Sequence, residues 1–219
     1  MRFDDIIPVH VADVTYPADH PLGGTSGPVM VFVVRHPQGL LLVDTGFTEG
    51  HAWIDEHYQP VSRPIKVALF AARIDADAIG MIVNTHMHFD HAGQNFEYPE
   101  IPIVVQDAEY QVAWDEGYTV KEWIDFEEAN YLRVMGDTEL ADGLRVIATP
   151  GHTPGHQSVL VDTEEGLVVI AGQAAHDPRD FATRQGDASI ERLKALGAAR
   201  IHFSHDRGVL TKTDKRRSN

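Results

Sequence analysis

The chain has 219 residues, of which 43% are hydrophobic and 23% charged, and this suits one globular domain spanning 1–219 with a sizeable core. Its formal net charge of −15 would repel nucleic acid and anionic membrane surfaces, so neither is expected as a partner. The absence of cysteine excludes disulfides and thiolate ligands, so any bound metal must be held by nitrogen and oxygen atoms.

The N-terminal stretch, MRFDDIIPVH, carries acidic residues where a signal peptide would need an apolar segment. No apolar run in the chain is long enough to span a bilayer. We therefore expect a cytoplasmic protein. The basic tail at 212–217 is expected to be a solvated terminus, and nothing in the sequence indicates the oligomeric state.

Two apolar hairpins are the clearest structural features of the sequence. The first is expected at 28–46 with its turn at 36–39, and the second at 157–172 with its turn at 162–166. Further strands are expected at 79–84, 101–105, 144–149 and 199–205, and helices at 107–116, 120–130 and 187–196. Because hairpins mix with strand–helix units, the sequence predicts an α/β sandwich with mixed sheets, not a doubly wound parallel sheet.

The segment NTHMHFDHAG, at 84–93, follows an apolar strand and is crowded with histidine. Side chains two apart on an extended segment point the same way, so His86 and His88 can approach one ion together. Asp90 and His91 follow where the strand gives way to a turn, and they can aim at a second ion. Imidazole and carboxylate ligands suit zinc, and also iron, cobalt or manganese.

Two later histidines lie just beyond other expected strands. His152 belongs to the turn TPGHTPGH, and His205 ends the last strand. Loops that follow strand ends can gather into one site, so these histidines are candidate ligands as well. The remaining isolated histidines are expected to be ordinary core or surface residues: His10, His20, His36, His51, His57 and His202.

The order H-x-H-x-D-H, then H, then H, with LLVDTG upstream, resembles the metallo-β-lactamase superfamily over nearly the whole chain. HPQGLLLVDTGF, NTHMHFDHAG and TPGHTPGHQSVLV look most like its N-acyl-homoserine lactonase-like branch. The resemblance implies a metallo-β-lactamase-like αββα sandwich that binds two divalent metal ions, with zinc the leading candidate. It gives one ion the ligands His86, His88 and His152, and the other ion Asp90, His91 and His205.

Two positions depart from the family pattern. Members generally have an aspartate that bridges the metals where this chain has Gln173. A neutral amide bridges poorly, so Gln173 is expected to weaken the second metal site unless Asp177 substitutes for it. Three residues further on, the lactonases have a tyrosine that contacts the substrate, whereas this chain has His176. His176 could act as an acid, as an extra ligand or as a bystander.

Asp44 and His156 each allow two interpretations. Asp44 could cap a turn through its own backbone. The resemblance instead makes it a buried group that orients a metal-bound histidine, and this interpretation is favoured. His156 could support the ligands in the same way or be a plain turn residue.

Divalent ions lower the pKa of bound water enough to supply hydroxide near neutral pH, and they polarise a carbonyl group. The predicted function is therefore a metal-dependent hydrolase that opens a small lactone, with N-acyl-homoserine lactones, and hence quorum quenching, as the leading case. Asp90 and His176 are the candidate catalytic residues. The alternatives are a thioesterase, another carboxylic-ester hydrolase of the superfamily, or a weakened small-ligand-binding protein. In the lactonases, a region like the aromatic stretch 114–131 walls an acyl-chain pocket.

Overall fold

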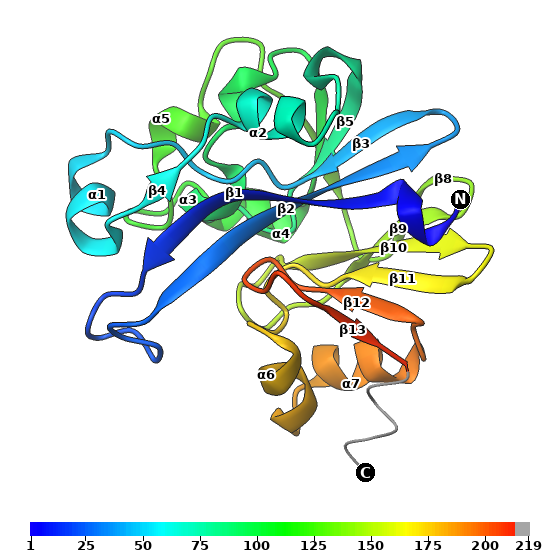
Figure 1. Cartoon of the computed structure of the whole chain (residues 1–219). Coiled ribbons are helices and arrows are strands. Elements are labelled where there is room, and N and C mark those ends of the chain that lie inside the picture. Colours follow the sequence, from blue (N-terminus) through cyan, green and yellow to red (C-terminus); the bar gives the residue numbers. More distant parts are fainter. Residues whose placement is uncertain (213–219) are drawn as a thin grey trace.

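The computed structural model describes residues 1–212 and contains two β-sheets (Figure 1). The first sheet has the order β4 (Val61–Ser62), β1 (Ile6–Thr15), β2 (Ser26–His36), β3 (Gly39–Val43), β5 (Ile79–Val83), β6 (Pro102–Gln106) and β7 (Asn130–Val134). The second has the order β13 (Val209–Thr211), β12 (Arg200–His202), β11 (Gly166–Ile170), β10 (Gln157–Thr163), β9 (Leu144–Ala148) and β8 (Thr138–Ala141). Both predicted hairpins are present, as β2–β3 and β10–β11.

Both sheets are mixed, as the sequence predicted. In the first sheet, β4 to β3 pair antiparallel, whereas β3, β5, β6 and β7 run parallel. In the second sheet, β8 to β11 pair antiparallel, and β11 runs parallel to β12. Each sheet therefore contains a hairpin whose second strand lies beside a parallel neighbour, so β3 and β11 hold equivalent places in the two halves.

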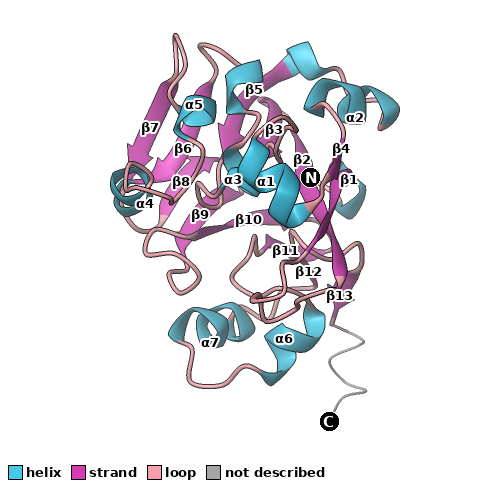
Figure 2. Ribbon diagram, turned by 90° about the vertical axis from the view of Figure 1, so that its left-hand side faces the viewer, coloured by secondary structure: helices cyan, strands magenta, loops and turns pink. Residues whose placement is uncertain are grey.

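The helices and sheets form four layers (Figure 2), and three apolar cores lie between them. The central core lies between the sheets and draws on both, for example through Val34 of β2 and Val159 of β10. Helices α1 (Ala52–Tyr58) and α2 (Ile65–Ala71) pack on the outer face of the first sheet. Helices α6 (Pro178–Thr183) and α7 (Ala188–Ala195) cover the second. This arrangement is the predicted αββα sandwich.

The segments that carry the candidate ligands all follow the C-terminal ends of their strands. Because β3 and β5 are parallel, residues 44–46 and 84–91 follow them at one edge of the first sheet. Strands β9, β11 and β12 also share a direction, so 149–156, 171–176 and 203–205 emerge together from the second sheet. The two sets of loops meet at one edge of the sandwich.

The predicted helix at 120–130 is wrong in most of its length. Helix α5 covers only Lys121–Ile124, and the chain turns at Asp125, whose φ and ψ are −105° and 81°. Residue Asn130 already pairs with Pro102 as the start of β7. This edge strand has an irregular, largely exposed pattern of side chains, so the sequence lacks the alternation that identifies a strand.

The other expected elements differ mainly in their ends. Helix α4 (Asp107–Val112) is shorter than the expected 107–116, while α7 matches its prediction and is capped by Asp187, which accepts hydrogen bonds from the N–H groups of Ser189 and Ile190. No helix within residues 1–212 combines the length and the apolar character needed to cross a membrane. Apart from Lys212, the predicted basic tail lies outside the described residues.

Strand β1 was not expected, yet it pairs with β2 from Ile6 opposite Val34 to Thr15 opposite Ser26. A register shift between His10 and Ala12 breaks its alternation of buried and exposed side chains. That irregularity hides the strand in the sequence. The strand matters for function because the next residue, Tyr16, lies at the ligand-bearing edge.

Candidate metal centre

Three imidazoles from two loops face one point. His86 and His88 follow β5, and His152 follows β9. Their ring centroids are 4.8 Å (His86–His88), 4.8 Å (His86–His152) and 4.9 Å (His88–His152) apart, close to an equilateral triangle. Nδ1 of His88 lies 3.1 Å from Nε2 of His152. Two nitrogens on a tetrahedral zinc ion would be about 3.3 Å apart, so this spacing suits zinc.

A second trio lies directly beside the first. Oδ2 of Asp90 is 3.5 Å from Nε2 of His91 and 3.5 Å from Nε2 of His205. The rings of His86 and His91 are 3.9 Å apart, so the two trios adjoin. The structure thus brings the six candidate ligands together in two groups, and within each group the ligand atoms lie within 4.8 Å of one another.

Three buried nitrogens of these groups make no hydrogen bond, namely Nε2 of His86, His91 and His205. The other ring nitrogen of two of these histidines has a partner. Nδ1 of His91 donates to Oδ2 of Asp44 at 2.8 Å, and Nδ1 of His205 donates to the carbonyl of Pro28 at 3.1 Å. In the neutral ring, Nε2 then carries a lone pair. A buried polar atom without a partner costs about 1–3 kcal/mol. A divalent cation would remove that cost, so the donor set fits a metal.

Asp44 forms hydrogen bonds to the loop that carries His86, His88, Asp90 and His91. Its Oδ1 accepts a hydrogen bond from the N–H of Thr85 at 2.7 Å, and its Oδ2 accepts from Oγ1 of Thr85 at 2.8 Å as well as from His91. Its φ of 62° lies in the left-handed region, which is strained for a residue with a side chain. The contact with His91 supports the orienting interpretation of Asp44 over the turn cap.

The electrostatics of the two trios differ. Burial lowers the pKa of His152 to about 2 and that of His205 to about 4, and it also holds the pKa of His86 well below the usual value. These rings are therefore neutral at pH 7. Burial opposes the protonated form of His91 too, but the carboxylates of Asp90 and Asp44 outweigh it and raise the pKa of His91 to about 9. A bound cation would take the place of that proton.

A fully buried carboxylate, which the sequence did not single out, joins the two loops of the first trio. Glu109 of α4 accepts hydrogen bonds from the N–H of Met87 at 2.8 Å, from Oγ1 of Thr153 at 2.6 Å and from the N–H of Gly155 at 3.2 Å. The phenol of Tyr118 donates to it as well. Its partners lie up to 46 residues away in the chain, so no local pattern identifies it.

The backbone of Glu109 lies in close contact with Gly155. A Cβ atom at Gly155 would lie 2.1 Å from the backbone nitrogen of Glu109, so only glycine fits there. Since Met87 lies between two candidate ligands and Thr153 directly follows a third, Glu109 fixes the distance between the two loops. It is therefore a positioning residue for the first trio.

Gln173 lies near a member of each trio, His91 and His152. Its backbone N–H donates to Nε2 of His156 at 3.0 Å, so His156 supports the ligand-bearing loop. The Gln173 side chain also helps to raise the pKa of His91. Nε2 of His91 itself makes no hydrogen bond. Gln173 and His152 line the same cavity. Asp177 does not replace the missing carboxylate, because its Oδ1 accepts from the N–H of Asp180 at 2.7 Å and so caps α6.

His176 lies at the edge of the second trio. Its ring stacks on that of His205, with centroids 5.0 Å apart and planes at 19°. It belongs to neither group of ligand atoms, which argues against its interpretation as an extra ligand. Its Nδ1 is buried and makes no hydrogen bond, whereas its backbone N–H donates to Oδ2 of Asp180 at 2.9 Å. Burial lowers the pKa of the ring.

A cavity of about 460 Å³ adjoins the trios, and its walls include His20, Leu22, Gln173, His176 and Arg184. The aromatic stretch 114–131, for which the resemblance implied an acyl-chain wall, contributes elsewhere. Trp123 and Phe126 of this stretch pack on the core of the first sheet, whereas Trp114, Tyr118 and Tyr131 pack on a small core that contains Met87, Val105 and Ile124. The latter three therefore support the first ligand loop from behind.

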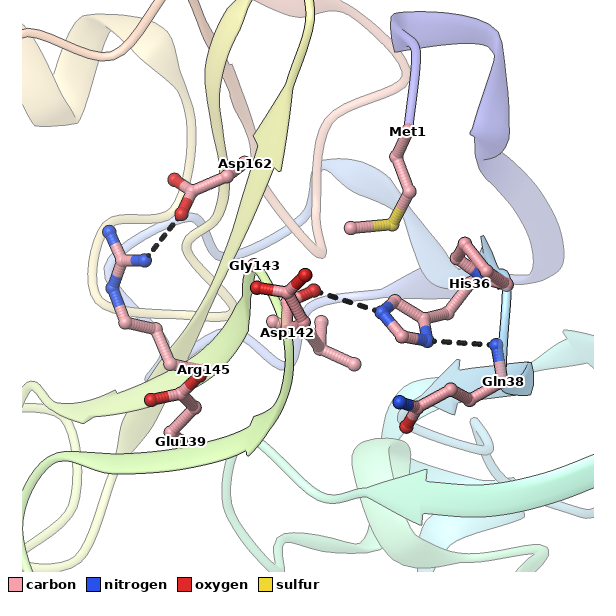
Figure 3. Close-up of a pocket in the computed structure, with 10 residues that line it drawn as sticks. Met1, His36, Gln38, Glu139, Asp142, Gly143, Arg145 and Asp162 are labelled. Carbon is pink, nitrogen blue, oxygen red and sulfur yellow. Dashed lines mark hydrogen bonds and ion pairs between the residues drawn. The ribbon is translucent and has the colours of Figure 1, made fainter.

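A second cavity, of about 490 Å³, lies at the opposite ends of the strands, beside the turn that precedes β3 (Figure 3). Its polar groups bond to one another: Nε2 of His36 lies 3.0 Å from the carbonyl of Asp142, and Nδ1 accepts from the N–H of Gln38 at 3.1 Å. Arg145 pairs with Asp162 at 2.8 Å. None of the candidate ligands lines this cavity, so it is no part of the metal centre.

Known proteins share this sequence and this fold. The model of the metallo-beta-lactamase superfamily matches residues 24–213. The chain is 30% identical to an N-acyl homoserine lactonase of Bacillus cereus and 31% identical to one of a Bacillus species, each over 82% of this chain and 81% of the relative. A solved quorum-quenching N-acyl homoserine lactone hydrolase is 28% identical, with a TM-score of 0.74 over 98% of this chain and 93% of that one. The chain belongs to the metallo-beta-lactamase superfamily.

Proposed function

We propose that this protein is a metal-dependent hydrolase that opens the ring of a small lactone, with N-acyl homoserine lactones as the first candidates. The observation that carries the proposal is the pair of adjoining ligand trios beside a cavity of about 460 Å³. Relatives of 30–31% identity are N-acyl homoserine lactonases. The net charge of −15 favours a neutral substrate over a polyanion.

One divalent ion would be held by His86, His88 and His152, and the other by Asp90, His91 and His205, with Gln173 between them. Zinc is the leading candidate, since imidazole and carboxylate are its usual ligands here, and iron, cobalt or manganese would also be accepted. Such ions, when bound, supply a nucleophile by lowering the pKa of water, and they polarise the carbonyl group.

Two side chains would act on the reacting groups. Burial opposes ionisation of Asp90, but His91 and His205 outweigh it and hold the pKa of the Asp90 carboxyl below its usual value. The ionised carboxylate would accept a hydrogen bond that orients the attacking water. His176, whose Nδ1 is buried without a partner, would donate a hydrogen bond to the oxygen that leaves as the ring opens.

Proton release by zinc-loaded protein tests this function. Short- and long-chain N-acyl homoserine lactones, a glutathione thioester and an aryl acetate are compared before and after removal of metal by a chelator. We expect the lactones to be opened with the highest kcat/KM, and only by loaded protein. Turnover of the thioester or the acetate without the lactones would favour another ester hydrolase of the superfamily.

Gln173 favours one further candidate, a small-ligand-binding protein of weakened activity, because a neutral amide lies where a carboxylate would complete the centre. Calorimetry with the same lactones separates the two functions. Binding of a lactone by zinc-loaded protein without proton release would support the binding protein and contradict the hydrolase.

Replacing Gln173 by aspartate is expected to tighten the weaker metal site about 10-fold or more, because a carboxylate adds a charged ligand between the trios. Competition with a chromophoric chelator measures this affinity. The matched control is Gln38→Asp, on the exposed turn before β3, which should leave metal affinity unchanged. An unchanged affinity in Gln173→Asp would show that the glutamine does not limit metal binding.

A further inference from the structure

Tyr16, the residue after strand β1, forms a hydrogen-bonded pair with His176. Its hydroxyl oxygen lies 2.8 Å from Nε2 of His176, and the two residues are 160 positions apart in the chain. The tyrosine is only 5% exposed and stacks on His20, with ring centroids 4.5 Å apart. Gly27 leaves space for the hydroxyl, since a Cβ there would lie 2.6 Å from it. The pair is therefore held in place by its surroundings.

The geometry gives this hydrogen bond a direction. The phenol has one proton, and within residues 1–212 Nε2 of His176 is the one hydrogen-bond partner found for its oxygen. The proton has no other acceptor, so the hydroxyl donates and Nε2 accepts. Burial, with the nearby carboxylate of Asp90, raises the pKa of Tyr16, so the phenol keeps its proton at neutral pH.

A neutral imidazole that accepts at Nε2 carries its proton at Nδ1. Nδ1 of His176 is the atom that is buried without a partner, in a ring that stacks on His205 and lines the cavity beside the ligand trios. An N–H donor without a protein partner is thus left in a side chain that lines this cavity. Without the phenol, nothing on this side of the ring would select that tautomer.

We propose that Tyr16 is a positioning residue that fixes His176 with its proton on Nδ1, so that this N–H can donate to the ring oxygen of the lactone. The proposal rests on the proposed function. As water adds to the carbonyl carbon, the acyl carbon–oxygen bond of the ring breaks and its electron pair stays on the ring oxygen. The hydrogen bond from Nδ1 stabilises that charge, and the oxygen finally takes the proton that the attacking water gives up.

Nuclear magnetic resonance tests the tautomer without any substrate. Long-range proton–nitrogen correlations of zinc-loaded, nitrogen-15-labelled protein distinguish a protonated Nδ1 from a protonated Nε2, and a His176→Gln spectrum assigns the signals. We expect protonated Nδ1 in the wild type and a shift toward protonated Nε2 in Tyr16→Phe. The control Tyr98→Phe removes another buried hydroxyl, which makes no hydrogen bond, and should leave the signals unchanged. Protonated Nε2 in the wild type would overturn the proposal.

Leaving-group dependence tests the consequence. A lactone expels an alkoxide, which needs a donor, whereas the matching thiolactone expels a thiolate, which needs far less help. Tyr16→Phe should lower kcat for the lactone about 10- to 100-fold and for the thiolactone less than about 3-fold. Equal losses for both substrates would indicate a merely structural role and contradict the proposal. If the wild type opens no lactone, the proposed function fails, and the tautomer measurement still decides the role of Tyr16.

Discussion

Replacing His88 by alanine is expected to lower kcat/KM for lactone opening on the order of 1,000-fold or more and to release metal from the first trio. The remaining imidazoles, His86 and His152, would offer a metal two ligands in place of three. The ring centroids of these two are 4.8 Å apart, and no other candidate ligand belongs to their group. Steady-state kinetics and the metal content of the dialysed protein measure the two effects.

His36→Ala is the matched control for this change. His36 lies in the cavity at the opposite ends of the strands, where it bonds to the backbone of Asp142 and Gln38 (Figure 3). Its removal should leave metal content and kcat/KM within about 2-fold of the wild type, because the site is distant from both trios. Full activity of His88→Ala with normal metal content would show that this histidine is not a metal ligand.

Replacing Glu109 by glutamine is expected to destabilise the protein by about 2–4 kcal/mol and to weaken metal binding at the first trio about 10- to 100-fold. The carboxylate of Glu109 now accepts hydrogen bonds from the N–H of Met87 and the hydroxyl of Thr153. The side-chain amide of glutamine would place its own N–H group against one of these donors, and that donor would lose its acceptor. For a chain of this size the loss corresponds to about 5–15 °C in Tm. Thermal unfolding of metal-free protein and zinc competition measure stability and affinity separately.

Glu97→Gln makes the same chemical change at a partly exposed surface ion pair, where Glu97 lies 3.4 Å from Lys66. Exposed pairs contribute little, so the expected change in the free energy of unfolding is below about 1 kcal/mol. If Glu109→Gln were as mild as this control, the buried carboxylate would not hold the two ligand loops together.

Four of the six candidate ligands were accessible to sequence reasoning because their spacing is local, and His152 and His205 were found because each lies just beyond an expected strand. Within six positions after one strand lie His86, His88, Asp90 and His91. A short-range pattern of this kind can be recognised in the sequence without knowing how the rest of the chain folds. The hairpins were equally clear, since a core on the inner face of each sheet demands long apolar runs. The hairpins, mixed with strand–helix units, predicted an α/β sandwich with mixed sheets, and the family resemblance implied its αββα layers.

Two of the supporting groups, Tyr16 and Glu109, were not accessible in this way. Tyr16 reaches His176 only because β1 pairs with β2 along its length, and a bulge hides β1 in the sequence. Glu109 looks like an ordinary acidic residue of a short helix until its partners, 22 and 44 positions away, are brought to it. Contacts of this range follow from the packing of loops at the sheet edge and leave no periodic signal.

Metal-dependent hydrolysis is tested most directly by a titration of metal-free protein with zinc, in which bound zinc and the rate of lactone opening are measured in the same samples. Metal-dependent hydrolysis requires no opening at zero zinc, a rate that rises with the zinc bound, and a return to zero when a chelator removes the zinc. Opening of the lactone at full rate by protein that carries no metal would contradict it.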